Sequence, residues 1–324
     1  MTVAFLFPGQ GAKGLFEAAS FVANEPRGKE MLDRAAEATD IAPSELLAKG
    51  GRALERTEVQ QPALTAIALF VHVELLAAGI PPDFVAGHSL GELPAWAATG
   101  AITPEDAIMI AALRGRLMAR EAARHPGMML ALSCAELSPV LLRGTLQRAI
   151  ARCGSKVTIA ATNTPDELVV SGDEETIGKL VKTLEDAQGG FNDNKPFHFR
   201  RLPVAGPWHS ESMKDAVPEL EAALTRARRG AMRVPLVLNA TGKLAEEEGS
   251  VPRLLAGQLV SAVRWTDVMT TLKDRGVTDY VTIAPGAVLR SLVRTNLGPD
   301  VRIHATENTA DIRRTADALR RSLS

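Results

Sequence analysis

One short stretch constrains the fold of this chain more than any other, the sequence Gly-His-Ser-Leu-Gly-Glu at residues 87–92. Residues 83–86 before it have the character of a short buried strand, and the alanine-rich segment 93–98 after it has that of a helix. A Gly-x-Ser-x-Gly at a strand-to-helix turn is typical of a nucleophile elbow, where the glycines permit a sharp turn and expose the serine hydroxyl. A serine in a glycine-containing turn is also common without such a role, and it is the flanking strand and helix that favour the elbow. The stretch therefore predicts an α/β fold with Ser89 as candidate nucleophile.

A serine nucleophile needs a base and a partner for the negative charge that forms on its target. The Leu90 backbone N–H follows Ser89 at a helix N-terminus, where negative charge is favoured. Of the six histidines, His209 is the best candidate base, because residues 205–208 (Ala-Gly-Pro-Trp) force an irregular loop before it. His88 adjoins the serine, but we expect its side chain to leave the elbow in another direction and to support the turn.

Charge and cysteine content exclude several classes of protein. The 324 residues carry a formal net charge of -1, which argues against a dedicated nucleic-acid binder. Cys134 and Cys153 form neither a disulfide framework nor a zinc-ligand cluster, so we expect both to be reduced. No basic region precedes the apolar N-terminus, as a signal peptide would require. Residues 57–62 are typical of a helix entry, with Pro62 opening a helix over the apolar run 63–78. This run is interrupted by polar residues and is short, so we expect a buried helix, no membrane span and a cytoplasmic protein.

The middle of the chain has a different order of predicted strands and helices from its two ends. Residues 128–202 read as strand, helix, strand, strand, helix, strand, which is the split βαβ pattern. We therefore expect a discontinuous large domain with a parallel sheet at residues 1–127 and 203–324, and an inserted small domain at 128–202. In the large domain, strands are expected at 3–7, 236–239 and 279–283 and a helix at 212–228. A further helix is expected near the C-terminus, with Ile312, Ala316, Leu319 and Leu323 on its apolar face.

The glycine-rich sequence at 8–11, after the first predicted strand, invites comparison with phosphate-binding loops. It lacks the third glycine and the acidic partner of a dinucleotide fingerprint, and no Gly-Lys-Ser/Thr follows it. Its backbone N–H groups could instead face another anion.

Five motifs occur along the chain in a specific order. They are Phe-Pro-Gly-Gln-Gly at 7–11, Gln-Pro-Ala-Leu at 61–64, the hexapeptide at 87–92, Arg-Gly-Arg-Leu-Met at 114–118 and Trp-His-Ser at 208–210. Together they strongly resemble the malonyl-CoA:acyl-carrier-protein transacylase family, including the free-standing acyltransferases that serve polyketide synthases. The resemblance covers the whole chain. It implies an α/β-hydrolase-like domain with an inserted ferredoxin-like subdomain.

The resemblance also implies roles for individual residues. Ser89 would be the nucleophile and His209 its base, with the backbone N–H groups of Gln10 and Leu90 as oxyanion hole. The backbone carbonyl of Gln258 would orient the histidine, so that no acidic third member is needed. Arg114 would bind the free carboxylate of the malonyl group, a task that suits a permanently charged guanidinium fork. Gln61 and Asn163 match positions that line the cleft.

Some positions depart from the family pattern. Residues 11–13 read Gly-Ala-Lys where Gly-Ser-Gln is usual, residues 284–287 read Ala-Pro-Gly-Ala where Val-Gly-Pro-Gly-Lys is usual, and Glu167 replaces a common glutamine. None of these touches Ser89, His209 or Arg114. Trp208 stands at the position associated with choice of acyl unit, and its bulk favours malonyl over methylmalonyl.

The expected function is transfer of a malonyl group from malonyl-CoA to the phosphopantetheine thiol of an acyl carrier protein. It needs no metal or redox cofactor, and we expect a monomer that binds neither nucleic acid nor membrane. Because carrier proteins are usually acidic, a basic surface near the cleft is expected, although each candidate is also an ordinary surface charge: Lys195, Arg200, Arg201, Arg290 and Arg294. Two alternatives remain, an acyl hydrolase that clears stalled carrier proteins and a non-catalytic scaffold subunit. Fatty acid and polyketide pathways are equally compatible with the sequence.

Overall fold

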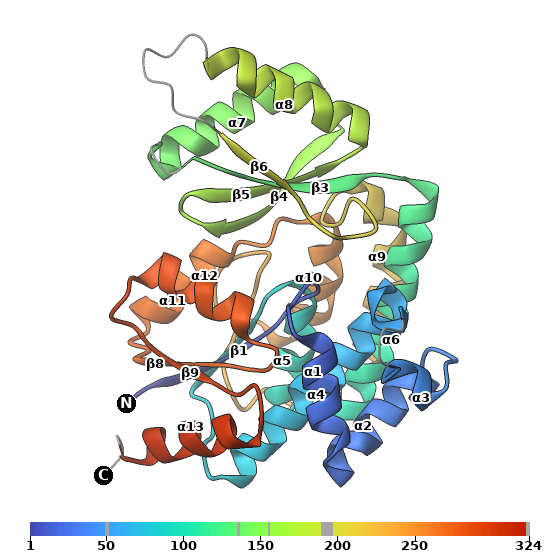
Figure 1. The fold of residues 1–324 in the computed structure, drawn as a ribbon, viewed down its shortest axis with the longest axis vertical. Coiled ribbons are helices and arrows are strands. Elements are labelled where there is room, and N and C mark those ends of the chain that lie inside the picture. The colour runs from blue at the N-terminus through green and yellow to red at the C-terminus, as the bar shows by residue number, and fades with distance from the viewer. Residues whose placement is uncertain (49–51, 135–136, 155, 189–196, 322–324) are drawn as a thin grey trace.

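Two β-sheets of different construction organise the chain (Figure 1). The larger sheet has the strand order β7-β2-β1-β8-β9, and all of its pairings are parallel. The smaller has the order β4-β5-β3-β6 and is antiparallel. The strands are β1 (Val3–Phe7), β2 (Phe84–Gly87), β3 (Met128–Ser133), β4 (Val157–Thr164), β5 (Glu167–Gly172), β6 (His198–Arg201), β7 (Leu236–Val237), β8 (Asp279–Thr282) and β9 (Arg302–Ala305).

The computed structural model describes residues 1–48, 52–134, 137–154, 156–188 and 197–321. Lys195 and Leu323, which carry two of the sequence-based expectations, lie outside these ranges. Helices of the larger part are α1 (Leu15–Ala23), α2 (Pro26–Glu37), α3 (Pro43–Leu46), α4 (Thr57–Ala77), α5 (Glu92–Ala98), α6 (Pro104–Arg124), α9 (Val217–Ala227), α10 (Val251–Gly257), α11 (Trp265–Asp274), α12 (Ala287–Leu297) and α13 (Thr309–Arg321). Helices α7 (Pro139–Cys153) and α8 (Glu174–Gln188) cover the small sheet (Figure 1).

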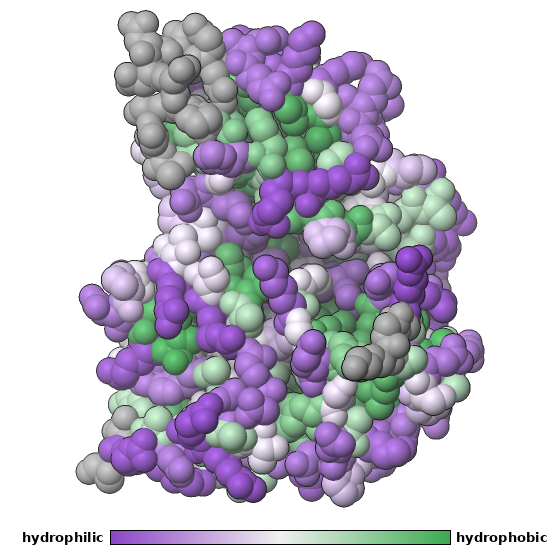
Figure 2. All heavy atoms as spheres, viewed as in Figure 1, coloured by the Kyte–Doolittle hydropathy of each residue, from purple (hydrophilic) through white to green (hydrophobic). Residues whose placement is uncertain are grey.

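The observed architecture confirms the expected fold class. In the small sheet, the first strand of the split βαβ unit, β3, lies between the third and the fourth. On the face shown in Figure 2, the surface is hollowed where the part with the small sheet meets the rest of the molecule. All strands of the small sheet fall within residues 128–202, while the domain boundaries themselves stay a prediction.

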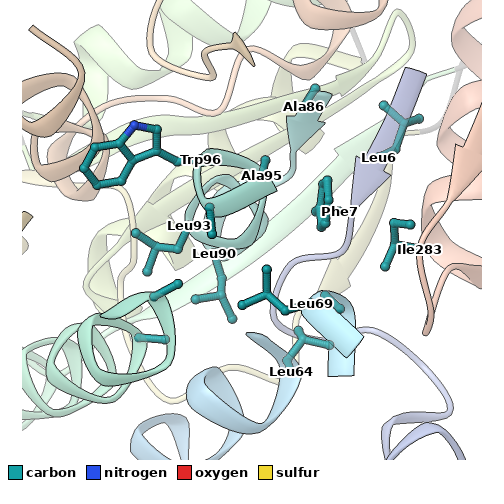
Figure 3. Packing of buried hydrophobic residues seen from close by; sticks show 14 of the residues in the cluster. Leu6, Phe7, Leu64, Leu69, Ala86, Leu90, Leu93, Ala95, Trp96 and Ile283 are labelled. Atoms are coloured by element: carbon teal, nitrogen blue, oxygen red, sulfur yellow. The ribbon is translucent and has the colours of Figure 1, made fainter. Parts of the chain in front are cut away.

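Helix α4 occupies the centre of the large core. Figure 3 shows Leu64 and Leu69 of this helix close to Phe7 of β1 and to Leu90 of the turn after β2. With 21 residues, α4 is long and apolar enough to cross a membrane by length and composition, which the sequence analysis did not expect. However, 78% of its most apolar window is buried inside the structure, so that it packs as the expected core helix.

The sequence was wrong about where α4 begins. Pro62 was expected to open the helix, yet the helix begins at Thr57 and contains the proline. The proline gives up one backbone hydrogen bond near the helix start. Val59 and Gln61 are almost fully buried on the extra turn, and this packing compensates for the loss.

The single helix expected at 212–228 is in fact two segments. The 3₁₀-helix η3 (Glu211–Ala216) is followed directly by α9, which has a proline in its first turn. Because proline has no N–H and restricts the residue before it, the chain changes helix type at this point.

Candidate active site

The turn that carries Ser89 requires glycine on both sides. Ser89 has a φ of 51°, a left-handed conformation that is unusual for a residue with a side chain. A Cβ atom on Gly87 would lie 2.0 Å from the backbone of Gly91, and one on Gly91 would lie 2.2 Å from the carbonyl oxygen of Phe7. The glycines therefore allow the elbow to close on itself and to pack against the end of β1.

Asn239, which the sequence analysis missed, supports the elbow from the neighbouring strand. Its Oδ1 accepts a hydrogen bond from the Ser89 N–H at 2.7 Å, and its Nδ2 donates to the Gly87 carbonyl at 2.6 Å. The residue lies just after β7, which pairs with β2 in parallel. A polar residue at the carboxyl end of a predicted parallel strand was the signal that could have identified it.

Ser89 and His209 lie in direct contact. The distance between Ser89 Oγ and His209 Nε2 is 2.8 Å, and His209 Nδ1 lies 2.8 Å from the Gln258 backbone carbonyl oxygen. A carbonyl oxygen can only accept a hydrogen bond, so Nδ1 carries the proton and Nε2 is free to accept the serine proton. Burial, with the nearby Arg114 charge, lowers the pKa of His209 to about 3, which keeps the ring neutral at physiological pH.

Arg114 projects from α6 toward the same serine. Its guanidinium donates to Gln61 Oε1 at 2.9 Å, to Gln258 Oε1 at 2.8 Å and to Ser89 Oγ at 3.3 Å. Its exposed fraction is 2%, and burial lowers its pKa to about 10, so that it remains charged near neutral pH. The structure thus brings together a neutral histidine, a serine and a buried cation.

The loop after β1 packs against the elbow. The side chain of Gln10 donates to Thr57 Oγ1 at 3.0 Å and accepts from Gln61 Nε2 at 3.3 Å. A Cβ on Gly9 would lie 2.4 Å from the His88 carbonyl oxygen, so only glycine permits this approach. Leu90 lies in the first helical turn after Ser89, where backbone N–H groups lack partners within the helix.

Comparison with known proteins identifies the family. The model of the family described as "Acyl transferase domain" matches residues 4–313. The chain belongs to this acyl transferase family.

Individual relatives cover nearly the whole chain. A malonyl CoA-acyl carrier protein transacylase of Bacillus subtilis is 32% identical over 296 residues, which are 90% of this chain and 89% of the relative. The polyketide biosynthesis malonyl CoA-acyl carrier protein transacylase BaeC of Bacillus velezensis is 29% identical over 293 residues, covering 90% and 95%. The crystal structure of MCAT from Streptococcus pneumoniae superposes with a TM-score of 0.85 at 27% identity, covering 98% of this chain and 100% of that one.

Three further residues singled out from the sequence surround this acyl transferase site. Asn163 Oδ1 lies 2.9 Å from His88 Nε2, so the asparagine contacts the histidine of the elbow. This contact agrees with the expectation that His88 supports the turn. Trp208 is buried at 3% exposure in the loop before His209, and its ring packs against Gly206, where a Cβ would lie 2.8 Å from the ring.

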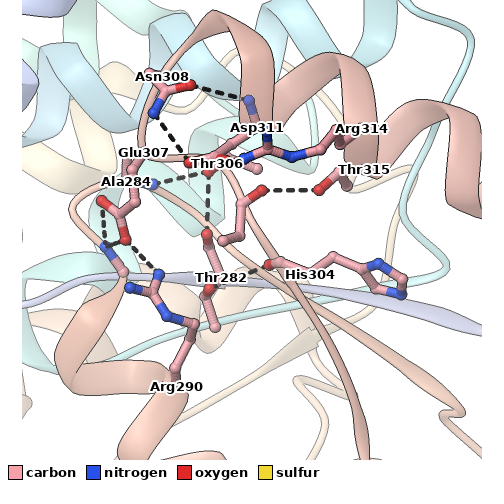
Figure 4. A network of polar contacts seen from close by, with 12 residues as sticks. Thr282, Ala284, Arg290, His304, Thr306, Glu307, Asn308, Asp311, Arg314 and Thr315 are labelled. Atoms are coloured by element: carbon pink, nitrogen blue, oxygen red, sulfur yellow. Dashed lines mark hydrogen bonds and ion pairs between the residues drawn. The ribbon is translucent and has the colours of Figure 1, made fainter.

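Most of the expected basic surface is neutralised by ion pairs in this acyl transferase. Arg200 pairs with Glu167 at 3.2 Å, and Arg201 pairs with Glu174 at 2.6 Å. Figure 4 shows Arg290 against Glu307, which also accepts from the Gly286 N–H in the atypical 284–287 loop. Only the exposed Arg294 of the four described candidates has no ion pair within the described part of the chain. The carrier-binding surface stays a prediction. Its positive electrostatic potential is weaker than the number of arginines suggests, because acids neutralise most of them.

Proposed function

We propose that this chain transfers a malonyl group from malonyl-CoA to the phosphopantetheine thiol of an acyl carrier protein, through an ester on Ser89. The observation that carries the proposal is the Arg114 guanidinium, 3.3 Å from the serine hydroxyl that also contacts His209. A malonyl group has a carboxylate close to its reacting carbonyl, and a buried cation beside the nucleophile suits such a substrate. The names of the relatives support this substrate and this acceptor.

In the first half-reaction, Ser89 Oγ attacks the thioester carbon of malonyl-CoA while His209 Nε2 takes the hydroxyl proton. The carbonyl oxygen becomes an oxyanion, which the backbone N–H groups of Gln10 and Leu90 stabilise. When the intermediate collapses, the carbon–sulfur bond breaks, and the coenzyme A thiol leaves with the proton from His209. A malonyl ester on Ser89 remains.

In the second half-reaction, the phosphopantetheine thiol of the carrier protein attacks this ester. His209 takes the thiol proton and returns it to Ser89 Oγ as the ester bond breaks, which restores the free enzyme. The two substrates therefore react in turn at one serine, a ping-pong sequence. The bonds and protons balance without a metal or redox cofactor, so none is required by the proposal.

The preference for malonyl over methylmalonyl groups, the monomeric state and the cytoplasmic location belong to the same proposal. The buried ring of Trp208, next to His209, supports the preference, because an α-substituent would need space in a closely packed region.

Intact-mass spectrometry after incubation with malonyl-CoA tests the proposal. We expect a malonyl adduct on the wild-type protein and none on Ser89→Ala, whose folding should be unchanged because the side chain is small. Methylmalonyl-CoA and acetyl-CoA serve as comparison substrates, and a carrier protein carrying phosphopantetheine should remove the adduct.

Other outcomes would favour the alternatives. Free coenzyme A accumulating without an adduct or a loaded carrier would support the acyl hydrolase. Neither adduct nor free coenzyme A would support the non-catalytic scaffold. Full transfer by Ser89→Ala would exclude the proposed serine ester.

A further inference from the structure

A buried acid, Glu92, lies directly beneath the elbow and has no role in the transfer chemistry described above. It is the first residue of α5 and is 2% exposed. Its Oε1 accepts from the Asn239 backbone N–H at 2.5 Å, and its Oε2 accepts from the Gln258 side-chain amide. Burial raises the pKa of Glu92, while these two hydrogen bonds and the Arg114 charge favour its ionised form, in which both oxygens accept. Burying an acid is costly in free energy unless hydrogen-bond partners compensate, so these partners are part of what holds Glu92 in place.

The Gln258 side chain connects this acid to the cation of the site. Its Oε1 accepts from Arg114 Nη2 at 2.8 Å, while its Nε2 donates to Glu92 and, at 2.9 Å, to the Ser89 carbonyl. A guanidinium can only donate hydrogen bonds, and both carboxyl oxygens of Glu92 face N–H donors. A flipped amide would set its NH₂ group against the guanidinium and its oxygen against the carboxyl group. The amide therefore has one acceptable orientation, and Glu92 fixes one end of it.

We propose that Glu92 is a positioning residue that locks the Gln258 amide and thereby holds the Arg114 guanidinium beside Ser89. This inference rests on the proposed function, in which Arg114 binds the substrate carboxylate. Glu92 does not touch the substrate. It acts through Gln258, whose backbone carbonyl separately orients His209.

The substitution Glu92→Gln keeps the size of the side chain and replaces the acid by a neutral amide, which changes both its charge and its hydrogen bonding; the control Glu121→Gln loses a buried acid in the same way. A glutamine has one acceptor oxygen for the two donors that face Glu92, so one donor must oppose its NH₂ group. Relief of that conflict turns the Gln258 amide and releases Arg114. Glu121→Gln is the matched control, because Glu121 is a fully buried acid on α6 that pairs with Arg120 and Arg124 instead.

Steady-state kinetics with malonyl-CoA and acetyl-CoA measure the effect on substrate choice. We expect Glu92→Gln to lower kcat/KM for malonyl about tenfold more than for acetyl, since acetyl has no carboxylate for Arg114 to bind. Glu121→Gln should leave the ratio of the two unchanged. Glu92→Asp retains two acceptor oxygens on a side chain that is one methylene shorter, so its malonyl preference should fall between those of the wild type and Glu92→Gln. If Glu92→Gln does not fold, Glu92→Asp takes its place, and an unchanged ratio in Glu92→Asp would overturn the inference. An unchanged malonyl-to-acetyl ratio in a folded Glu92→Gln would overturn the inference.

A second readout does not depend on activity. NMR of ¹⁵N-arginine-labelled protein, with Arg114→Lys to assign the signal, reports whether the guanidinium is immobilised. We expect resolved Arg114 Nη signals in the wild type and averaged signals in Glu92→Gln. If the wild type forms no malonyl ester, the proposed function fails, and the NMR comparison still decides the role of Glu92. Resolved signals in Glu92→Gln would show that Glu92 does not hold Arg114.

Discussion

At the scale of single residues, the site depends on what each side chain can donate or accept. Arg114 is held by two neutral amides, Gln61 and Gln258, and by the Ser89 hydroxyl, with no acid in direct hydrogen-bond contact with it within the described chain. Its charge is thus available to a carboxylate from outside.

Replacing Arg114 should separate charged from uncharged substrates. We expect Arg114→Ala to reduce malonyl loading about a hundredfold, because charge-assisted bonds to a carboxylate are lost, and acetyl loading much less. Arg114→Lys keeps the charge without the fork and should fall between the two. Single-turnover loading with each thioester measures the difference. An equal loss for malonyl and acetyl would mean that the arginine is structural.

The lowered pKa of His209 predicts how the rate of serine acylation depends on pH. With a pKa of about 3, the ring stays neutral between pH 7 and pH 5, so its protonation should cause no loss of serine acylation in this range. A histidine with an ordinary pKa of about 6.5 would be mostly protonated at pH 5. The rate of the acyl-enzyme burst against pH tests this, and a fall with a midpoint near 6.5 would contradict it.

Sequence reasoning found the residues of the site that belong to contiguous motifs. Ser89 lies in a glycine-defined turn and His209 in an irregular loop, and these local features are readable along the chain. Asn239 was missed, because its contact with Ser89 follows from β7 pairing with β2, and strand order is not encoded locally. Glu92 belongs to the hexapeptide at 87–92, but the role proposed for it depends on Gln258, which is distant in sequence.

At the scale of elements, the elbow and the ends of the strands are packed without spare room. Gly87 and Gly91 are needed because backbone, rather than flexible side chains, occupies the space that a Cβ would take. Replacing a glycine by alanine should therefore destabilise the protein in the elbow and stabilise it on an exposed helix face.

Glycine-to-alanine substitutions at matched sites test this. Gly87→Ala should cost about 3 kcal/mol of unfolding free energy, because its Cβ would lie 2.0 Å from backbone atoms of Gly91. Gly178→Ala, on the exposed side of α8 with nothing within 4 Å of the new Cβ, should stabilise by about 0.5–1 kcal/mol. Urea unfolding of both variants measures the contrast. A Gly87→Ala protein as stable as the wild type would show that the elbow can relax.

Helices and strands were predicted well where local hydrophobicity alone determines where they lie. Short apolar runs located the strands, whereas the start of α4 was misplaced because tertiary packing overrides the local preference of Pro62. The break between η3 and α9 carried a proline signal that could have been used.

At the scale of the whole molecule, the site forms because parallel strands end at one edge. Gln10 follows β1, Ser89 follows β2 and Asn239 follows β7, and these three strands are neighbours in the sheet. The sequence predicted the strands and the inserted small domain. It could not predict the strand order that brings the three residues together.

Buried neutral histidines should make the whole fold sensitive to acid. Burial in the core lowers the pKa of His72 to about 4, so between pH 6.5 and pH 4 the unfolded chain binds a proton that the folded chain does not. Stability then falls as pH falls, by about 1.4 kcal/mol per pH unit for this group.

The substitution His72→Leu isolates this contribution. His72 lies between the rings of Phe5 and Phe7, an apolar environment that accepts leucine. The unfolding free energy of the variant should depend less steeply on pH between 6 and 4.5, by about 1.4 kcal/mol per unit. Chemical denaturation at a series of pH values measures the slopes, and identical slopes would show that His72 does not bind a proton on unfolding.

The two amides on Arg114 have a consequence for how the site treats an arriving acyl group. A carboxylate that takes the place of Gln61, while Gln258 stays on the guanidinium, replaces one hydrogen-bond acceptor by another, so only the difference between the two acceptors contributes to its binding. An acyl group without a carboxylate cannot make that exchange and leaves the guanidinium satisfied where it is. Selectivity then comes from competition between acceptors in the resting enzyme, which gives the buried guanidinium hydrogen-bond partners while no substrate is bound.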